Sequence, residues 1–399
     1  MSRPTADDLA AAYRRAWPSL IGQLVRDYGS LELAEDCVQE AAARALDAGP
    51  LRDPIAWVAT VARRLAVDEL RKEQVRRRKA PLLAEPAVMA PTAPATTGDD
   101  RLDLLVLACH PVLPAGSRMP LALRFVLGVP TEALADAFGV EHQAMSARLT
   151  RAKRRLDAHG RRFDPPGPGH RGEVYGEICV LYTLGHTALA GPLLGREADR
   201  STAVELARAA ARAWPADPEA KGLVALLLLT EARTPGRRDT TGRPVTLREA
   251  DRASWDARLV SEGLGLAAEA LPSMGRFALQ AGIAGLHSAA PTWEETDWPA
   301  VVALYDRLLE RWPSPGAAVA RAVAIGYGEG PEAGLAALER VPGPFGGALA
   351  RQVAAARADL LRLAGRTLEA RAAYGEALTL ERNQVLRDFL TGQLAELAG

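Results

Sequence analysis

Two proline-bearing stretches constrain how this chain of 399 residues can fold. Residues 80–100 contain four prolines and many alanines but no aromatic residue, a composition that favours a flexible linker over a packed core. Residues 163–172, FDPPGPGHRG, should not sustain a helix, because proline lacks the backbone donor that a helix needs. A chain of this length exceeds one compact domain. The two stretches predict domains at residues 1–79, 101–162 and 173–399, with the linker at residues 80–100.

Each of the three parts has the sequence character of α-helices. Ala, Leu, Arg and Glu are frequent, whereas Phe, Trp and Tyr together make up only 5% of the chain. Apolar residues recur at helical spacing in residues 9–28 and 31–46, and again from Ile55 onward. Asp53 followed by Pro54 is a good helix start, since aspartate caps the first turn and proline fits it. We therefore expect an all-α protein.

A helix-turn-helix is predicted in residues 131–149. The apolar side chains of its first helix, Leu134 and Phe138 among them, should face inward. Gly139 suits the turn because glycine adopts a positive φ easily, and the second helix should begin near His142. The second helix of such a motif enters the major groove of DNA.

The charges of the chain are balanced overall but not locally. Lys and Arg number 49, as do Asp and Glu, so the formal net charge is zero. Residues 63–79 nevertheless hold eight basic and three acidic residues, and residues 148–162 hold seven and one. Two such basic segments predict local surfaces that bind phosphate.

The third part is expected to fold as a TPR-like helical-repeat domain. In residues 354–380, small residues and a tyrosine stand at the spacings of a tetratricopeptide (TPR) repeat, and residues 203–229 and 298–338 follow the pattern less closely. Stacked helix pairs form a solenoid with a concave face that suits another protein segment. This domain should therefore regulate the rest of the chain or bind a protein partner.

Three isolated cysteines, Cys37, Cys109 and Cys179, favour a reducing cytoplasm over a disulfide framework. The N-terminus lacks the apolar core of a signal peptide, and the longest apolar run, residues 223–229, is far shorter than the roughly 20 residues that span a bilayer. Cys109 and His110 are adjacent without a second ligand pair nearby, which makes a poor zinc site. With no catalytic motif in the sequence, we expect a cytoplasmic protein that is not an enzyme and uses no metal, cofactor or membrane.

Several segments carry a resemblance to a known family. Residues 34–40, AEDCVQE, and residues 56–71 stand in the first part, and residues 131–156 end the second. In this order they resemble the polymerase-clamp-binding helix, the −10-binding helix and the −35-reading helix-turn-helix of extracytoplasmic-function (ECF, or group 4) sigma factors of RNA polymerase. Residues 251–256 and 279–287 look like the ECF subgroup with a long C-terminal TPR-like extension. The resemblance implies two small helical sigma domains followed by a TPR-like domain.

The same resemblance implies the partners of the chain. These are promoter DNA and core RNA polymerase, which the family contacts at its clamp helices and flap. Asp36, Gln39 and Glu40 would face the clamp helices, and a row of carboxylates and an amide on one helix suits a basic partner surface.

For the −10 element, the resemblance implies that four side chains contact the phosphates of melted DNA: Arg63, Arg64, Arg71 and Lys72. Trp57 could stack on a base, but its helical spacing with Val61 favours a place in the core.

For the −35 element, the resemblance implies that four side chains near the start of the recognition helix reach base edges: His142, Gln143, Ser146 and Arg148. Gln pairs naturally with adenine, and Arg with guanine. Four further side chains are expected to hold phosphates and to make binding salt-dependent: Arg151, Lys153, Arg154 and Arg155.

Two other classes of function stay open. The chain could be a polymerase-independent helix-turn-helix regulator with a TPR-type sensor, although the clamp-binding motif at residues 36–40 would then have no use. An enzyme could also lie in residues 173–399, although these residues contain no catalytic constellation.

Overall fold

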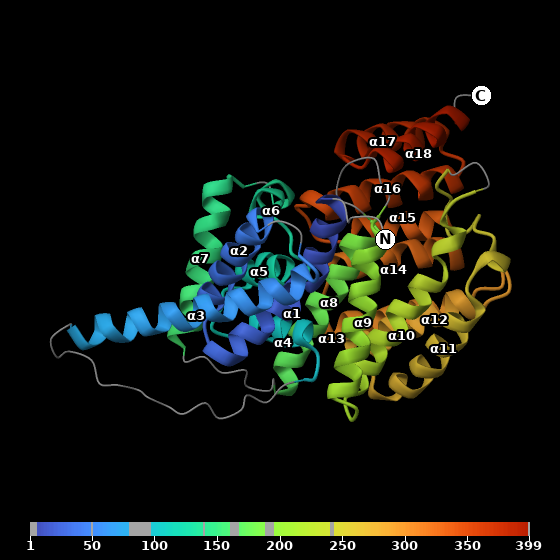
Figure 1. The fold of residues 1–399 in the computed structure, drawn as a ribbon. Coiled ribbons are helices and arrows are strands. Elements are labelled where there is room, and N and C mark those ends of the chain that lie inside the picture. The colour runs from blue at the N-terminus through green and yellow to red at the C-terminus, as the bar shows by residue number, and fades with distance from the viewer. Residues whose placement is uncertain are drawn as a thin grey trace. The chain divides into compact units, whose positions relative to one another are not determined.

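The computed structural model describes residues 6–48, 51–79, 97–138, 140–159, 167–187, 195–239 and 243–397. Within these ranges the regular structure consists of eighteen α-helices and three short 3₁₀ helices, apart from an isolated bridge between Arg238 and Pro244 (Figure 1). The prediction of an all-α protein is confirmed. The chain divides into two compact units, Met1–Ile178 (unit 1) and Cys179–Gly399 (unit 2).

Unit 1 begins with three helices, α1 (Ala6–Tyr28), α2 (Leu31–Asp47) and α3 (Pro54–Lys79). The Ser30 hydroxyl caps α2 by accepting a hydrogen bond from the backbone N–H of Leu33 at 3.2 Å. The Asp53 carboxylate accepts one from the backbone N–H of Ala56 at 3.0 Å, so the predicted start of this helix at Asp53 and Pro54 is confirmed. Local capping therefore fixes where α2 and α3 begin.

Four further helices follow in unit 1: α4 (Asp100–Ala108), α5 (Ala115–Val126), α6 (Thr131–Phe138) and α7 (His142–Ala158). Helices α6 and α7 form the predicted helix-turn-helix, and both contact α5. Leu134 of α6 is fully buried, as expected, but Phe138 is 37% exposed. The prediction for Phe138 is wrong because it is the last residue of a helix of only eight residues, at the edge of a small core.

Helix α8 (Pro168–His186) begins inside the second proline-bearing stretch. The prediction that residues 163–172 sustain no helix is therefore wrong from Pro168 onward. Proline is tolerated in the first turn of a helix, where its missing N–H has no intrahelical partner to lose. The boundary between the units lies within α8, after Ile178. Residues 80–96 of the predicted linker and residues 160–166 lie outside the described part of the chain.

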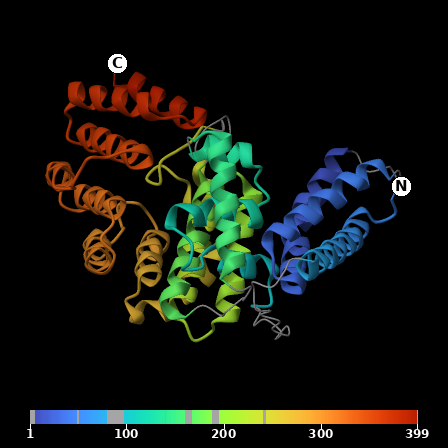
Figure 2. The ribbon, with the colours of Figure 1, turned by 90° about the vertical axis from the view of Figure 1, so that its left-hand side faces the viewer.

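Unit 2 continues with ten α-helices and three 3₁₀ helices: α9 (Glu197–Ala213), α10 (Pro218–Ala232), η1 (Thr234–Arg237), η2 (Arg252–Ser254), α11 (Ala257–Ala270), η3 (Leu271–Ser273), α12 (Arg276–Ala289), α13 (Trp298–Arg311), α14 (Pro315–Gly328), α15 (Pro331–Glu339), α16 (Gly347–Leu363), α17 (Thr367–Leu380) and α18 (Gln384–Glu396). Helices that follow one another in the sequence pack together, as in the pairs α10–α11, α14–α15 and α16–α17. Figure 2 shows α13 to α18, in orange to red, stacked in chain order. The likeness of these helix pairs to TPR repeats stays a prediction.

Glycine allows helices of unit 2 to touch at the backbone in two places. A Cβ on Gly222 of α10 would lie 2.6 Å from the backbone nitrogen of Ala278 in α12. A Cβ on Gly334 of α15 would lie 2.7 Å from the Cα of Gly326 in α14. Any larger residue at either position would push the helices apart.

In the part of the chain that the structure describes, no helix is both long enough and apolar enough to cross a membrane.

Candidate polymerase and nucleic-acid interface

Helix α2 presents the three predicted polymerase contacts on one exposed face. Asp36, Gln39 and Glu40 are all exposed, and their spacing of three and four residues makes them neighbours on the helix surface. Glu40 accepts a hydrogen bond from Arg44 at 2.8 Å, an exposed pair of the kind that contributes about 0–1 kcal/mol. Gln39 Nε2 donates to Glu35 Oε1 at 3.1 Å, so of the three side chains only Asp36 makes no hydrogen bond among the described residues.

A buried carboxylate lies next to this exposed row. Glu35 of α2 is 7% exposed. Its Oε1 accepts hydrogen bonds from Arg124 of α5 at 2.6 and 2.8 Å, and its Oε2 accepts one from Lys153 of α7 at 2.8 Å. The guanidinium of Arg124 also lies 5.1 Å from the ring centre of Trp17. Glu35 thus joins α2 to both α5 and α7.

A second contact joins the start of α2 to the end of α7. The Ser30 hydroxyl donates to Asp157 Oδ2 at 2.8 Å, and the Leu31 N–H donates to Asp157 Oδ1 at 3.4 Å. Figure 1 shows the two helices side by side, in agreement with their contacts. The predicted recognition helix α7 is therefore joined to the predicted polymerase-binding helix α2 at two points.

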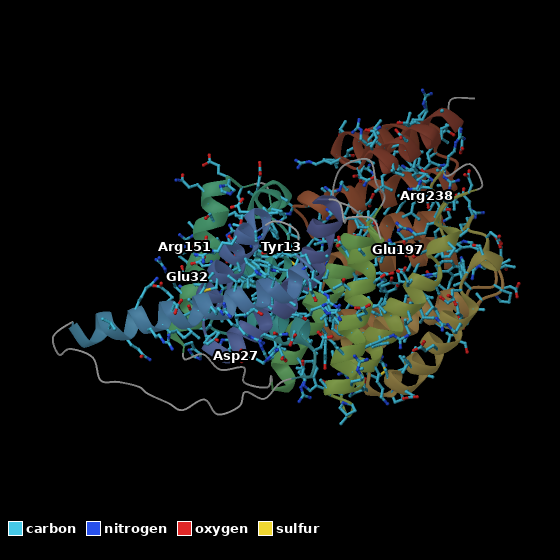
Figure 3. The ribbon with its side chains drawn as sticks, in the orientation of Figure 1. Tyr13, Asp27, Glu32, Arg151, Glu197 and Arg238 are labelled. Atoms are coloured by element: carbon cyan, nitrogen blue, oxygen red, sulfur yellow. The ribbon has the colours of Figure 1, made fainter. Side chains whose placement is uncertain are left out.

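The predicted −35 contacts differ in exposure. Lys153, expected to hold a phosphate, is buried against Glu35 and does not face solvent in this arrangement. Arg148 is half-buried, and six others are exposed: His142, Gln143, Ser146, Arg151, Arg154 and Arg155. Among the described residues, none of these seven side chains has a hydrogen-bond or ion-pair partner. Figure 3 labels one of them, Arg151, on α7.

On α3, the four predicted −10 cations are all exposed: Arg63, Arg64, Arg71 and Lys72. Arg63 donates to Gln23 of α1 at 3.0 Å, and Lys72 lies 3.1 Å from the carboxylate of Glu69. Exposed pairs of this kind contribute only about 0–1 kcal/mol, so both cations can exchange their partners for a phosphate.

Trp57 occupies an intermediate position. The sequence favoured a core position for Trp57, in line with Val61, but both residues are only half-buried. The buried line of α3 instead runs through Val58, Ala62 and Ala66, where small side chains let neighbouring helices approach. Stacking of Trp57 on a base stays a prediction.

Cys109 and His110, considered for a metal, lie at the end of α4. Cys109 is fully buried, and burial raises its pKa well above the ordinary thiol value. The ring of His110 lies 4.8 Å from that of His159 and 6.4 Å from that of His170. Across the ranges that the structure covers, no group of three His, Cys, Asp or Glu side chains is arranged to hold a metal ion.

The sequence reasoning missed Glu35 and Asp157, the two acids that hold α2 and α7 together. A signal for Glu35 was available. It lies on the side of α2 that also carries Leu31, Ala34 and Val38, and an acid among apolar residues on a buried face requires a cationic partner.

Comparisons with known families match two separate segments of the chain. Residues 10–76 match Sigma-70 region 2, a stretch that spans most of α1 to α3 and contains the predicted polymerase and −10 contacts. Residues 171–271 match a family of unknown function, DUF6596.

Two curated relatives extend this result. The chain is 37% identical to the uncharacterized protein R00370 of Rhizobium meliloti over 98% of its own length and 96% of that protein. It is 28% identical to the probable ECF RNA polymerase sigma factor SigI of Mycobacterium tuberculosis, over 38% of this chain and 55% of that protein. No solved structure matches the chain.

Proposed function

We propose that this chain, which is in one family with its Rhizobium meliloti relative, acts as an ECF-type sigma factor, because residues 10–76 match Sigma-70 region 2 and part of the chain is similar to a probable ECF sigma factor. It binds core RNA polymerase, directs it to specific promoters and starts transcription there, without catalytic activity of its own. One observation carries the proposal: the region 2 match at residues 10–76 coincides with the exposed row of Asp36, Gln39 and Glu40 on α2.

In this proposal α3 holds the melted −10 element. Its exposed cations follow the phosphates of the single strand. The half-buried ring of Trp57 offers a surface on which a base can stack, an interaction worth about 1–3 kcal/mol per base.

Helix α7 reads the −35 element. The exposed side chains at its start, Gln143 among them, reach base edges together with Arg148, while Arg151, Arg154 and Arg155 hold the phosphates. Their lack of partners within the described part of the chain supports this role, because no ion pair has to be broken before DNA binds.

The contact between α2 and α7 must open for both elements to be read together. The −10 and −35 elements lie about 25 base pairs apart, which is about 85 Å along B-DNA. A compact unit of 178 residues is only about 40 Å across. We therefore propose that the arrangement described above is the polymerase-free form. Opening it would release Lys153 from Glu35 toward a phosphate.

We further propose that unit 2 is a TPR-like domain that regulates the sigma domains or binds a protein partner. One support for this proposal is that the match to the Rhizobium meliloti relative extends through unit 2. Another is that a family of unknown function matches residues 171–271. The alternative is a polymerase-independent helix-turn-helix regulator with a TPR-type sensor. The region 2 match counts against this alternative, since such a regulator has no need of a polymerase-binding helix.

Binding to core polymerase tests the proposal. We expect the purified chain to co-elute with core RNA polymerase in gel filtration, and the variant Asp36→Lys/Glu40→Lys to bind at least tenfold more weakly, because its reversed charges meet a basic surface. Both residues are exposed, so the variant should fold.

Glu339→Lys, an equally exposed acid on α15, is the matched control and should bind as the wild type does. A chain that binds promoter DNA but never co-elutes with the polymerase would favour the alternative regulator.

A further inference from the structure

Among the described residues of unit 2, Arg233 is an arginine without a hydrogen-bond or ion-pair partner. It follows the last residue of α10, and in the described part of the chain its guanidinium makes no hydrogen bond or ion pair. Other arginines of the unit are paired with acids: Arg200 lies 2.9 Å from Glu231, and Arg208 lies 2.6 Å from Glu262. Arg233 is only partly exposed, so water does not fully replace the missing partner.

The short helices η1, directly after Arg233, and η2, which contains a second arginine, Arg252, contact each other. The charges that act most strongly on Arg233 are those of Tyr182, Tyr305 and Arg252, and both arginines also act on His287. Burial lowers the pKa of Arg233, and the charge of Arg252 lowers it further. Two guanidinium groups that repel each other in a partly buried place are stabilised when an anion lies between them.

The two terminal nitrogens of the Arg252 guanidinium differ in their hydrogen bonds. Its Nη1 donates to two carbonyl oxygens at the end of α12, those of His287 at 2.7 Å and Ala290 at 2.6 Å. The guanidinium also lies 4.8 Å from the ring centre of Trp255. Within the described part of the chain its Nη2 is buried without a hydrogen-bond partner, and the exposed Glu294, whose charge acts on Arg252, makes no ion pair with it.

Five further buried polar atoms without partners among the described residues lie between residues 234 and 296. All can donate a hydrogen bond: Thr234 Oγ1, Trp255 Nε1, His287 Nδ1, Ser288 Oγ and Thr296 Oγ1. Buried polar groups are satisfied in the great majority of cases, so a concentration of unsatisfied donors points to a group that the chain itself does not supply. That group must accept hydrogen bonds.

Aromatic rings flank these donors. The ring of His287 lies 5.3 Å from that of Trp298 and 6.0 Å from that of Trp293, and Tyr327 lies 4.8 Å from Trp293. Burial, with the charges of Arg233 and Arg252, lowers the pKa of His287 to about 4, so this imidazole is neutral at pH 7. An apolar flank lowers the local dielectric and strengthens the attraction between the arginines and an anion.

We propose that Arg233 and Arg252, with the unsatisfied donors beside them, bind the oxyanion of a small metabolite, either a carboxylate or a phosphate. The planar guanidinium matches both groups through paired hydrogen bonds. The site lies wholly within unit 2, and its existence does not depend on whether the chain acts as a sigma factor. If the chain does act as a sigma factor, the metabolite is a candidate signal that acts through unit 2.

Calorimetric titration of the full chain tests this site without any polymerase. The probes are sodium phosphate and sodium benzoate, with sodium chloride at equal ionic strength as the baseline. We expect saturable binding of at least one probe. The probe that binds more tightly shows whether the site prefers a phosphate or a carboxylate. Arg233→Gln should weaken that binding at least tenfold, because it removes the unpaired charge.

Arg212→Gln, which removes an exposed arginine of α9, is the matched control and should leave the affinity unchanged. Circular dichroism establishes that each variant keeps its helices. If Arg233→Gln does not fold, Arg233→Lys decides, since it keeps the charge but loses the paired geometry and should bind at least threefold more weakly. Saturable binding of neither probe, or unchanged affinity in a folded Arg233 variant, overturns the proposal.

Discussion

The carboxylate of Glu35 balances the positive charges of Arg124 and Lys153 at a largely buried site. The side chains of Glu35, Arg124 and Lys153 are 9%, 15% and 11% exposed, so each charge depends on the others and not on solvent. A buried ion pair adds little net stability when complete, but removal of one partner leaves an uncompensated buried charge and costs about 3–5 kcal/mol.

Replacement of Glu35 by glutamine tests this dependence. Because Arg124 and Lys153 lose their counter-charge, we expect the free energy of unfolding in urea to fall by about 3 kcal/mol. Glu40→Gln, which breaks only the exposed pair with Arg44, should cost less than about 1 kcal/mol. Equal losses in the two variants would show that the Glu35 cluster is not buried in solution.

Glu177 of α8 predicts a pH dependence of stability. Burial raises its pKa from the ordinary 4.5 to about 7, and its Oε2 is buried without a partner. The folded chain therefore holds this proton more tightly than the unfolded chain. The resulting stability is complete below pH 4.5 and is lost as the pH rises through 7.

Glu177→Gln removes the ionisable carboxyl group, and with it the free-energy cost of ionising that group in the folded chain. Relative to wild type, the variant should gain about 2 kcal/mol in free energy of unfolding between pH 5 and pH 8, since one pKa unit corresponds to about 1.4 kcal/mol. Urea unfolding at both pH values measures the difference, and Glu132→Gln, at an exposed acid of α6, should show no such gain. A constant difference between the two pH values would mean that Glu177 titrates normally.

At the scale of helices, local signals in the sequence were sufficient for much of the fold. Apolar spacing predicted the helices of unit 1, and the start of α3 at Asp53 and Pro54 followed from capping, which involves only neighbouring residues. These local signals could not predict which helices contact each other. Lys153 looked like one more cation of a basic run, yet its partner Glu35 is 118 residues away. A charge run says which helix is basic but not which of its members a distant acid will neutralise.

The side chains of α7 that we propose to read bases and those that we propose to hold phosphates can be separated by experiment. Arg148→Ala should relax selection at one position of the −35 element by about 1–3 kcal/mol. Arg154→Ala should weaken binding equally on all sequences and reduce the slope of log K against log salt by about 1. Binding titrations on matched and substituted duplexes at several salt concentrations measure both effects. An equal loss of affinity on all sequences in Arg148→Ala would show that Arg148 contacts a phosphate and not a base.

At the scale of the whole chain, both predicted sigma domains lie in unit 1, and the boundary to unit 2 falls after Ile178, within α8. A chain that ends at Ile178 therefore keeps unit 1 together, whereas a cut near residue 163 would remove Glu173, whose carboxylate lies 2.7 Å from Arg118. If unit 2 regulates the sigma domains, this shorter chain should give a different amount of transcript from the full chain with the same polymerase.

Run-off transcription with core RNA polymerase tests the central claim most directly. Core polymerase alone initiates without promoter preference, so a library of genomic fragments serves as template. We expect the full chain to produce discrete transcripts from a subset of fragments and the variant Asp36→Lys/Glu40→Lys to abolish them. Absence of any transcript that depends on the wild-type chain, while the chain still binds DNA alone, would contradict its role as a sigma factor.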